Sequence, residues 1–192
     1  MKKIHRTFIA VEINNAVRDR AKKQIAALAG TSADVKWVEP HNLHFTLKFL
    51  GDVHQHELLD VCRAVAREAA KIPAFDLEVC GVGAFPNSAR PRTVWIGAKE
   101  GVASMITLHD QIEAALAPLG YREEHRQFQP HLTIGRVRGI GEGVAKLGSL
   151  LQQYADAPLG VIDVQKATIF ISTLTPDGPI YEVVGSATLG KA

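Results

Sequence analysis

The sequence has few of the features that mark secreted, membrane-spanning or metal-binding proteins. It contains only two cysteines, Cys62 and Cys80, and neither lies in a CxxC pair or in a Cys/His ligand pattern. We therefore expect two reduced thiols in apolar surroundings, in a cytoplasmic protein, and no disulfide or metal site. No apolar run is long enough to span a membrane. The apolar run near the start is short and carries Glu12, which predicts a first strand and not a signal peptide.

Excess charge of one sign is also absent. The formal net charge is +2 and the pI about 8.6, so no overall basic field marks the chain as a nucleic-acid coat protein. Binding of a polyanion would need a local patch of charge. The chain has 192 residues, of which 46% are hydrophobic, and this composition suits one domain with a sizeable core.

Alternating and helical apolar patterns predict an α+β protein. Alternation predicts strands over residues 6–13, 35–38, 43–51, 75–82, 92–98, 131–136, 159–164, 167–173 and 180–188. Spacing of three and four predicts helices over residues 17–28, 57–70, 102–116 and 144–154. No linker-like stretch interrupts the order, so we predict that residues 1–192 form a single bilobal domain.

A short motif occurs twice, and its two copies are separated by nearly half the chain. Each copy is a histidine, an apolar residue, a threonine and a second apolar residue: His44-Phe45-Thr46-Leu47 and His131-Leu132-Thr133-Ile134. On a strand, the histidine and threonine of each copy share one face and the apolar residues the other. We expect two similar lobes that each give one such strand to a shared cleft.

Paired imidazoles and hydroxyls favour acid–base chemistry. A metal would need further His, Cys, Asp or Glu ligands near the histidines, and the motifs supply hydroxyls and basic residues instead. No Gly-x-Ser-x-Gly motif is present, and neither cysteine adjoins a histidine. One imidazole can take a proton while its partner gives one, which suits in-line displacement at phosphorus.

The same motifs supply donors for the oxygens of a phosphate. Thr46 and Thr133 can donate hydrogen bonds to the non-bridging oxygens. Arg136 follows the second motif, where we expect Gly135 to let the backbone turn and bring the guanidinium into the cleft. Without a metal to activate a poor leaving group, a strained cyclic phosphodiester is the easier target.

Several motifs together make the chain similar to a known family. In chain order they are Arg6-Thr7-Phe8-Ile9-Ala10, Trp37, His44-Phe45-Thr46-Leu47-Lys48-Phe49-Leu50-Gly51, Phe85-Pro86, Arg90-Pro91-Arg92-Thr93-Val94-Trp95, Pro130-His131-Leu132-Thr133-Ile134-Gly135-Arg136, Ser172 and Gly178-Pro179-Ile180-Tyr181. The chain resembles the 2H phosphoesterase superfamily, and within it the RNA 2′,3′-cyclic phosphodiesterases, also called 2′-5′ RNA ligase-like proteins.

The resemblance implies two pseudo-symmetric lobes around a central cleft, each with an antiparallel sheet and helices packed outside. It implies metal-independent hydrolysis of RNA 2′,3′-cyclic phosphate ends to 2′-phosphate ends, with no cofactor, and reversible 2′-5′ ligation. His44 would be the acid and His131 the base, although the near-symmetry of the sequence leaves the two roles open. We expect a monomer that acts on RNA or oligonucleotide ends, tRNA fragments among them, and that does not bind membranes.

The secondary expectations concern the surroundings of the motifs. Four basic residues either line an RNA groove or are solvated surface: Lys48, Arg92, Arg126 and Arg138. Three aromatic residues either stack a base or pack in the core, and we favour the core: Phe8, Trp37 and Phe128. The remaining histidines have no partner pattern and are expected to be structural or exposed: His5, His41, His54, His56, His109 and His125.

Two alternatives stay open. The same chemistry could act on another cyclic phosphate, such as ADP-ribose cyclic phosphate, or on a 2′-5′ oligonucleotide. A protein of another class would only bind RNA ends, but such a module has no need of a matched acid and base.

Overall fold

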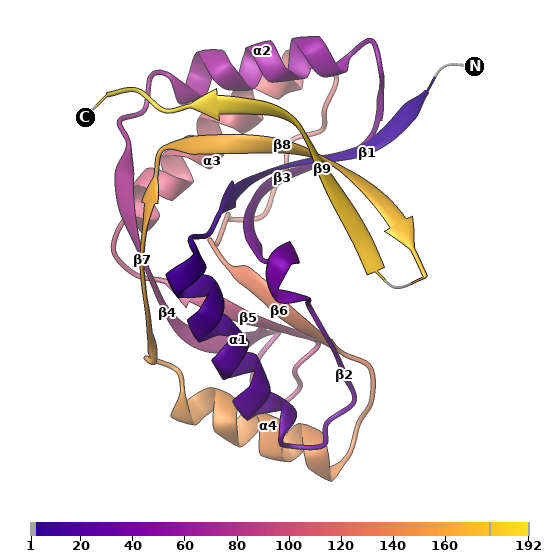
Figure 1. Ribbon diagram of the computed structural model, residues 1–192, viewed down its shortest axis with the longest axis vertical. Helices are drawn as coiled ribbons and strands as arrows, with labels where there is room; N and C mark the ends of the chain where they lie inside the picture. Colours follow the sequence, from indigo (N-terminus) through magenta and orange to yellow (C-terminus); the bar gives the residue numbers. More distant parts are fainter. Residues whose placement is uncertain (1–2, 177, 192) are drawn as a thin grey trace.

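The computed structural model describes residues 3–176 and 178–191, and within them the elements follow the predicted order (Figure 1). The strands are β1 (Ile4–Glu12), β2 (Val35–Trp37), β3 (His44–His54), β4 (Phe75–Phe85), β5 (Thr93–Ala98), β6 (Leu132–Val137), β7 (Pro158–Val164), β8 (Lys166–Thr175) and β9 (Gly178–Thr188). The α-helices are α1 (Asn15–Ala29), α2 (Leu58–Ala69), α3 (Val102–Leu116) and α4 (Glu142–Gln153), with 3-10 turns η1 (Pro40–Asn42) and η2 (Ala117–Leu119).

The strands form one curled antiparallel sheet in the order β7-β4-β5-β6-β3-β1-β8-β9, with β2 beside β6. The prediction of an α+β fold with antiparallel strands is therefore confirmed. The two half-sheets expected of the lobes are continuous, and their junction is a single residue pair, Phe45 of β3 with Leu132 of β6. One half holds β3, β1, β8 and β9, and the other holds β2 and β4 to β7.

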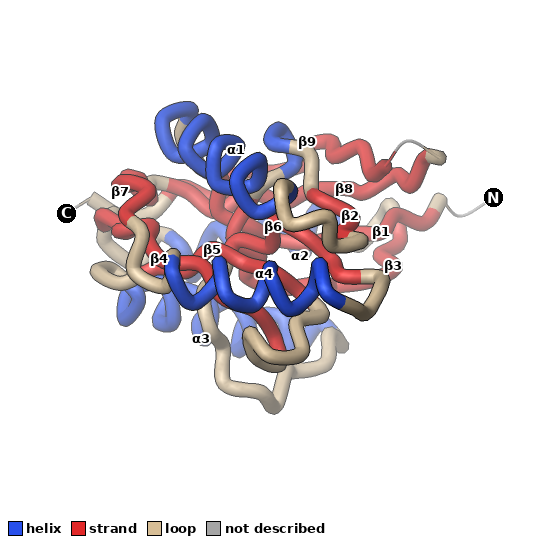
Figure 2. Tube along the Cα trace, turned by 90° about the horizontal axis from the view of Figure 1, so that it is seen from below, coloured by secondary structure: helices blue, strands red, loops and turns tan. Residues whose placement is uncertain are grey.

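The halves of the sheet do not correspond to the halves of the sequence. If β2, β7 and β9 are left out, the chain repeats a βαβαβ order, as β1-α1-β3-α2-β4 and β5-α3-β6-α4-β8, and each unit gives its last strand to the other half-sheet. Thus β4 pairs with β5, and β8 pairs with β1. The first helix of each unit, α1 or α3, also packs with the second helix of the other unit. In Figure 1, α2 and α3 lie together at one end and α1 and α4 at the other. Seen from below, α1 and α4 lie on the near side and α3 and α2 farther away (Figure 2).

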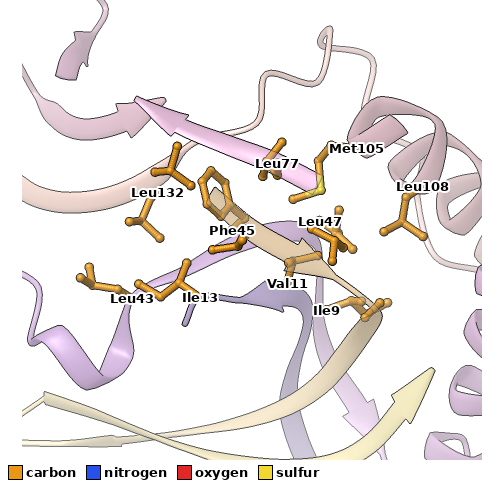
Figure 3. Packing of buried hydrophobic residues seen from close by; sticks show 14 of the residues in the cluster. Ile9, Val11, Ile13, Leu43, Phe45, Leu47, Leu77, Met105, Leu108 and Leu132 are labelled. Atoms are coloured by element: carbon orange, nitrogen blue, oxygen red, sulfur yellow. The ribbon is translucent and has the colours of Figure 1, made fainter. Parts of the chain in front are cut away.

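The main core lies between the sheet and the helices, and it includes the apolar residues of both motifs. Phe45 and Leu132 are fully buried, and Figure 3 shows them side by side, with Leu77 close by. A second, small cluster lies on the opposite face of the sheet. It consists of Phe8, Ala10 and Phe170, with Tyr181 packed against it.

The first helix begins with a side-chain cap, and both cysteines are only partly buried. The side chain of Asn14 caps α1, because its Oδ1 accepts a hydrogen bond of 2.9 Å from the amide of Val17. Cys62 and Cys80 are both free and half-buried, and burial raises the pKa of each thiol. No helix within residues 3–176 and 178–191 is long and apolar enough to cross a membrane.

Candidate active site

The junction between the half-sheets brings the two motifs together. Because Phe45 pairs with Leu132 in antiparallel register, His44 lies opposite Thr133 and Thr46 opposite His131. All four side chains are half-buried, whereas their apolar neighbours on these strands face the core. The register of β3 and β6 thus brings His44 and His131 together on one face of the sheet.

Both imidazoles are oriented in the same way. Nδ1 of His44 lies 2.7 Å from the carbonyl oxygen of Asn42, and Nδ1 of His131 lies 2.8 Å from that of Gln129. A carbonyl oxygen only accepts hydrogen bonds, so each Nδ1 must carry the proton and donate it. Nε2 is then the atom of each ring that gains or loses a proton. Two such Nε2 atoms are suited to one acid and one base.

The two rings have different surroundings. His44 stacks on Phe8, with ring centroids 4.8 Å apart, and meets the edge of Tyr181 at 5.4 Å. Burial among these rings lowers the pKa of His44, and the hydrogen bond to the carbonyl of Asn42 offsets part of the change. The imidazole of His44 is therefore neutral in the free protein at pH 7.

His131 packs against a smaller aromatic group on the other half-sheet. The edge of its ring meets Phe85, with centroids 5.1 Å apart, and Phe85 in turn packs on Trp95 at 5.4 Å. Trp95 can lie across β4 because residue 83 is a glycine: a Cβ there would stand 2.4 Å from the indole. Each imidazole thus rests on aromatic residues of its own half-sheet.

A β-bulge aims Arg136 at the site. On β6, Thr133 pairs with Trp95 and Arg136 with Thr93, which leaves two residues of β6 opposite Val94. Paired residues share a face, so the bulge puts Arg136 on the face of Thr133 where simple alternation would put it on the other. The positive charge of Arg136 acts on the hydroxyl of Tyr181. Burial raises the pKa of this hydroxyl, and the charges of Arg6 and Arg136 lower it again in part.

The role expected of Gly135 in this turn is wrong. Gly135 is not among the described residues with positive φ, so it allows no special backbone turn. A Cβ at this position would lie 2.7 Å from the ring of Trp37 and 2.8 Å from Val35. Glycine is needed here because β2 packs its side chains over β6.

A second bulge overturns the expectation for Lys48. On β3, Thr46 pairs with Ala10 and Lys48 with Ile9, so Leu47 has no partner on β1 and the alternation reverses. Lys48 consequently points into the core, where it is 2% exposed and donates to Glu113 and to the carbonyl of Arg122. It cannot line an RNA groove. Phe49, which simple alternation would bury, takes the site face instead and is 60% exposed.

The other secondary residues are placed as follows. Arg92, Arg126 and Arg138 are exposed. Trp37 and Phe128 pack against the main core, and Phe8 is buried in the second cluster beneath His44, so all three pack in apolar clusters as favoured. Among the remaining histidines, His109 is buried and stacks on Phe128 at 4.0 Å, and His41 is exposed beside a groove next to His44. Within the described ranges, no group of three or more His, Cys, Asp or Glu side chains could hold a metal ion.

Two oriented imidazoles and two hydroxyls lie on one face of adjacent strands, an arrangement that suits acid–base chemistry at phosphorus. The chain belongs to the family of LigT-like phosphoesterases, whose model matches it twice, over residues 11–95 and 96–181. Each match contains one copy of the His-x-Thr motif. The two matches together cover most of the chain and agree with its two exchanged βαβαβ units.

Relatives and solved structures resemble the chain over nearly its whole length. It is 37% identical over 177 residues to a protein of Archaeoglobus fulgidus named RNA 2′,3′-cyclic phosphodiesterase, which is 92% of this chain and 96% of that one. A protein of the same name from Methanothermobacter thermautotrophicus is 36% identical over 176 residues (92% and 94%). A crystal structure of a Thermus thermophilus protein aligns with a TM-score of 0.80 at 26% identity (97% and 98%). Escherichia coli LigT complexed with 3′-AMP aligns with a TM-score of 0.77 at 22% identity (97% and 99%), and it supports the fold alone.

Proposed function

We propose that this protein hydrolyses RNA 2′,3′-cyclic phosphate ends to 2′-phosphate ends by paired-histidine acid–base catalysis. The observation that carries the proposal is the register of β3 and β6, which sets the two His-x-Thr motifs side by side with both Nδ1 atoms engaged. It is joined by the relatives of 36–37% identity, which are named for this activity.

In this mechanism the phosphorus lies between the two Nε2 atoms. His131 takes a proton from water, the water oxygen attacks phosphorus, and the bond from phosphorus to O3′ breaks. His44 gives its proton to the departing O3′, so that the product has a 3′-hydroxyl and a 2′-phosphate. Hydroxyls of Thr46 and Thr133 and the guanidinium of Arg136 hold the non-bridging oxygens as charge develops on them.

The roles of acid and base follow from the family resemblance. Because His44 is neutral in the free protein, it must gain a proton before it can act as the acid. A bound cyclic phosphate carries a negative charge beside the ring, and an opposite charge favours the imidazolium form. Substrate binding itself would therefore charge His44. The reverse reaction, with a 5′-hydroxyl in place of water, would join RNA ends through a 2′-5′ linkage.

The test is hydrolysis of cytidine 2′,3′-cyclic phosphate by purified variants. His44→Ala and His131→Ala should each lower kcat by roughly 10²–10⁴, the contribution of a positioned acid or base. Arg63→Ala is the control, since Arg63 is exposed on α2. Activity should survive EDTA. A folded His44→Ala or His131→Ala protein with a near-normal rate would refute the mechanism, and loss of activity on chelation, restored by Zn²⁺, would revive a metal site.

The proposal extends to the surroundings of the reaction. We propose that residues 1–192 act as one bilobal domain, in a cytoplasmic monomer without cofactor or metal, on single-stranded RNA ends such as those of tRNA fragments. A module that only binds RNA ends is the second candidate. Release of a nucleoside 2′-phosphate from the cyclic compound distinguishes the two, because a binding module would release none.

A further inference from the structure

The site face continues beyond the histidines along β3 and β1. The bulge at Leu47 puts Phe49 on the face of Thr46, where it pairs with Phe8 across the strands. The two rings are 5.9 Å apart, and Phe8 is buried while Phe49 is 60% exposed. A large exposed aromatic residue that continues a row of packed rings leading from His44 offers a stacking surface for a base.

Arg6 lies next to this aromatic surface on the same face. On β1 it precedes Phe8 by two residues, and it pairs with Asp52 of β3 and Ser172 of β8. Arg6 is exposed. Although Asp52 is opposite in register, no ion pair of Arg6 occurs among the described residues, as the salt bridges there involve other side chains.

The position of Arg6 separates it from the reacting phosphate. Ala10, which pairs with Thr46, is four residues from Arg6 along β1, or about 13 Å at the rise of a strand. Arg6 still shares a face of the sheet with the site, because it pairs with Ser172, Ser172 pairs with Tyr181, and the ring of Tyr181 meets that of His44. Arg6 and Phe49 thus extend the site by one further cation and one further aromatic ring.

We propose that Arg6 and Phe49 bind the penultimate nucleotide of a single-stranded RNA substrate, Arg6 the phosphodiester on the 5′ side of the terminal nucleotide and Phe49 the penultimate base. This inference rests on the proposed function, and it makes an RNA strand, not a mononucleotide, the preferred substrate. A guanidinium binds phosphate oxygens in pairs. Stacking on an aromatic ring accepts any base, so this position should show little base preference.

The experiment compares kcat/KM for cytidine 2′,3′-cyclic phosphate with kcat/KM for a cytidine dinucleotide that ends in the same cyclic phosphate. The wild-type protein should prefer the dinucleotide. Arg6→Gln and Phe49→Leu should each lower the ratio of the two values by about 10-fold, which is within the range for one stacked base or one phosphate contact. Arg63→Gln and Leu59→Ala, which change exposed residues of α2, should leave the ratio unchanged.

Salt adds an independent measurement. A phosphate contact makes binding weaker as salt rises, so the wild-type ratio should fall between about 50 and 200 mM salt, and Arg6→Gln should make that fall shallower. Equal loss on both substrates, or no change of the ratio, would overturn the inference and leave the proposed function intact. A wild-type protein that hydrolyses neither substrate would refute the proposed function and, with it, the inference.

Discussion

Replacing Glu113 by alanine should destabilise the protein severely. Glu113 is 7% exposed and receives a hydrogen bond from the ammonium of Lys48, which is 2% exposed. Lys48 also donates to the carbonyl of Arg122 at 2.9 Å, and the amide of Glu124 lies 3.2 Å from Glu113. The alanine variant would leave a buried ammonium without its counter-charge, so we expect a loss of about 3–5 kcal/mol in the free energy of unfolding.

The assay is urea unfolding followed by circular dichroism, with two reference variants. Glu142→Ala removes a partner of Lys146 from a pair in which both side chains are more than half exposed, so it should cost no more than about 0.5 kcal/mol. The double variant Lys48→Met/Glu113→Leu removes both buried charges and should recover much of the loss. A free energy of unfolding for Glu113→Ala within about 1 kcal/mol of wild type would refute the reasoning.

The same residues hold the segment that leads to His131. Glu113 and Lys48 bind the main chain at Arg122 and Glu124, and His109 stacks on Phe128, three residues before His131. Since Gln129 orients the imidazole of His131 through its carbonyl, a loosened segment should lower kcat as well as stability. Glu113→Gln, measured where it remains folded, should show this loss without a comparable change in KM.

Two further predictions concern a glycine and the pH dependence of stability. Gly135→Ala should lower the free energy of unfolding, measured in urea, by about 1–3 kcal/mol, since its Cβ would lie 2.7 Å from Trp37. Gly30→Ala is the control and should be nearly neutral, because residue 30 has a φ of −61° and the nearest atom to its Cβ would be 3.4 Å away. Equal effects of the two substitutions would contradict the packing argument. Burial holds the folded-state pKa of His44 below its ordinary value of 6.5, so the unfolded chain binds more protons between the two values and stability falls as the pH drops below about 6.5. His44→Gln should reduce that fall in urea titrations at a series of pH values, and an unchanged pH dependence would show that His44 is not buried in its neutral form.

The order of the elements and the core face of each motif could be predicted from the sequence, because both follow from local periodicity. The two bulges could not, because a bulge is a mismatch between strands and leaves no mark in the pattern of one strand. At Leu47 it reverses the faces of Lys48 and Phe49, and at β6 it turns Arg136 toward the site. Lys48, in an otherwise apolar stretch, is only a weak signal for the bulge at Leu47. A buried lysine needs a partner, and nothing in the sequence of β3 indicates that Glu113 of α3 supplies it.

The exchange of strands and helices between the two βαβαβ units explains why a single residue pair is enough to hold the site together. If each half of the chain formed its own lobe, the pair of Phe45 with Leu132 would be the principal connection, and the distance between the two imidazoles would vary with any hinge motion. Because β4 lies in the half-sheet of β6 and β8 in that of β3, the chain crosses repeatedly between the lobes and each crossing restrains the same junction. The strands can therefore stay open to a ligand beside Phe45 and Leu132 while His44 and His131 keep a fixed separation, which the proposed transfer of two protons across one phosphorus atom requires.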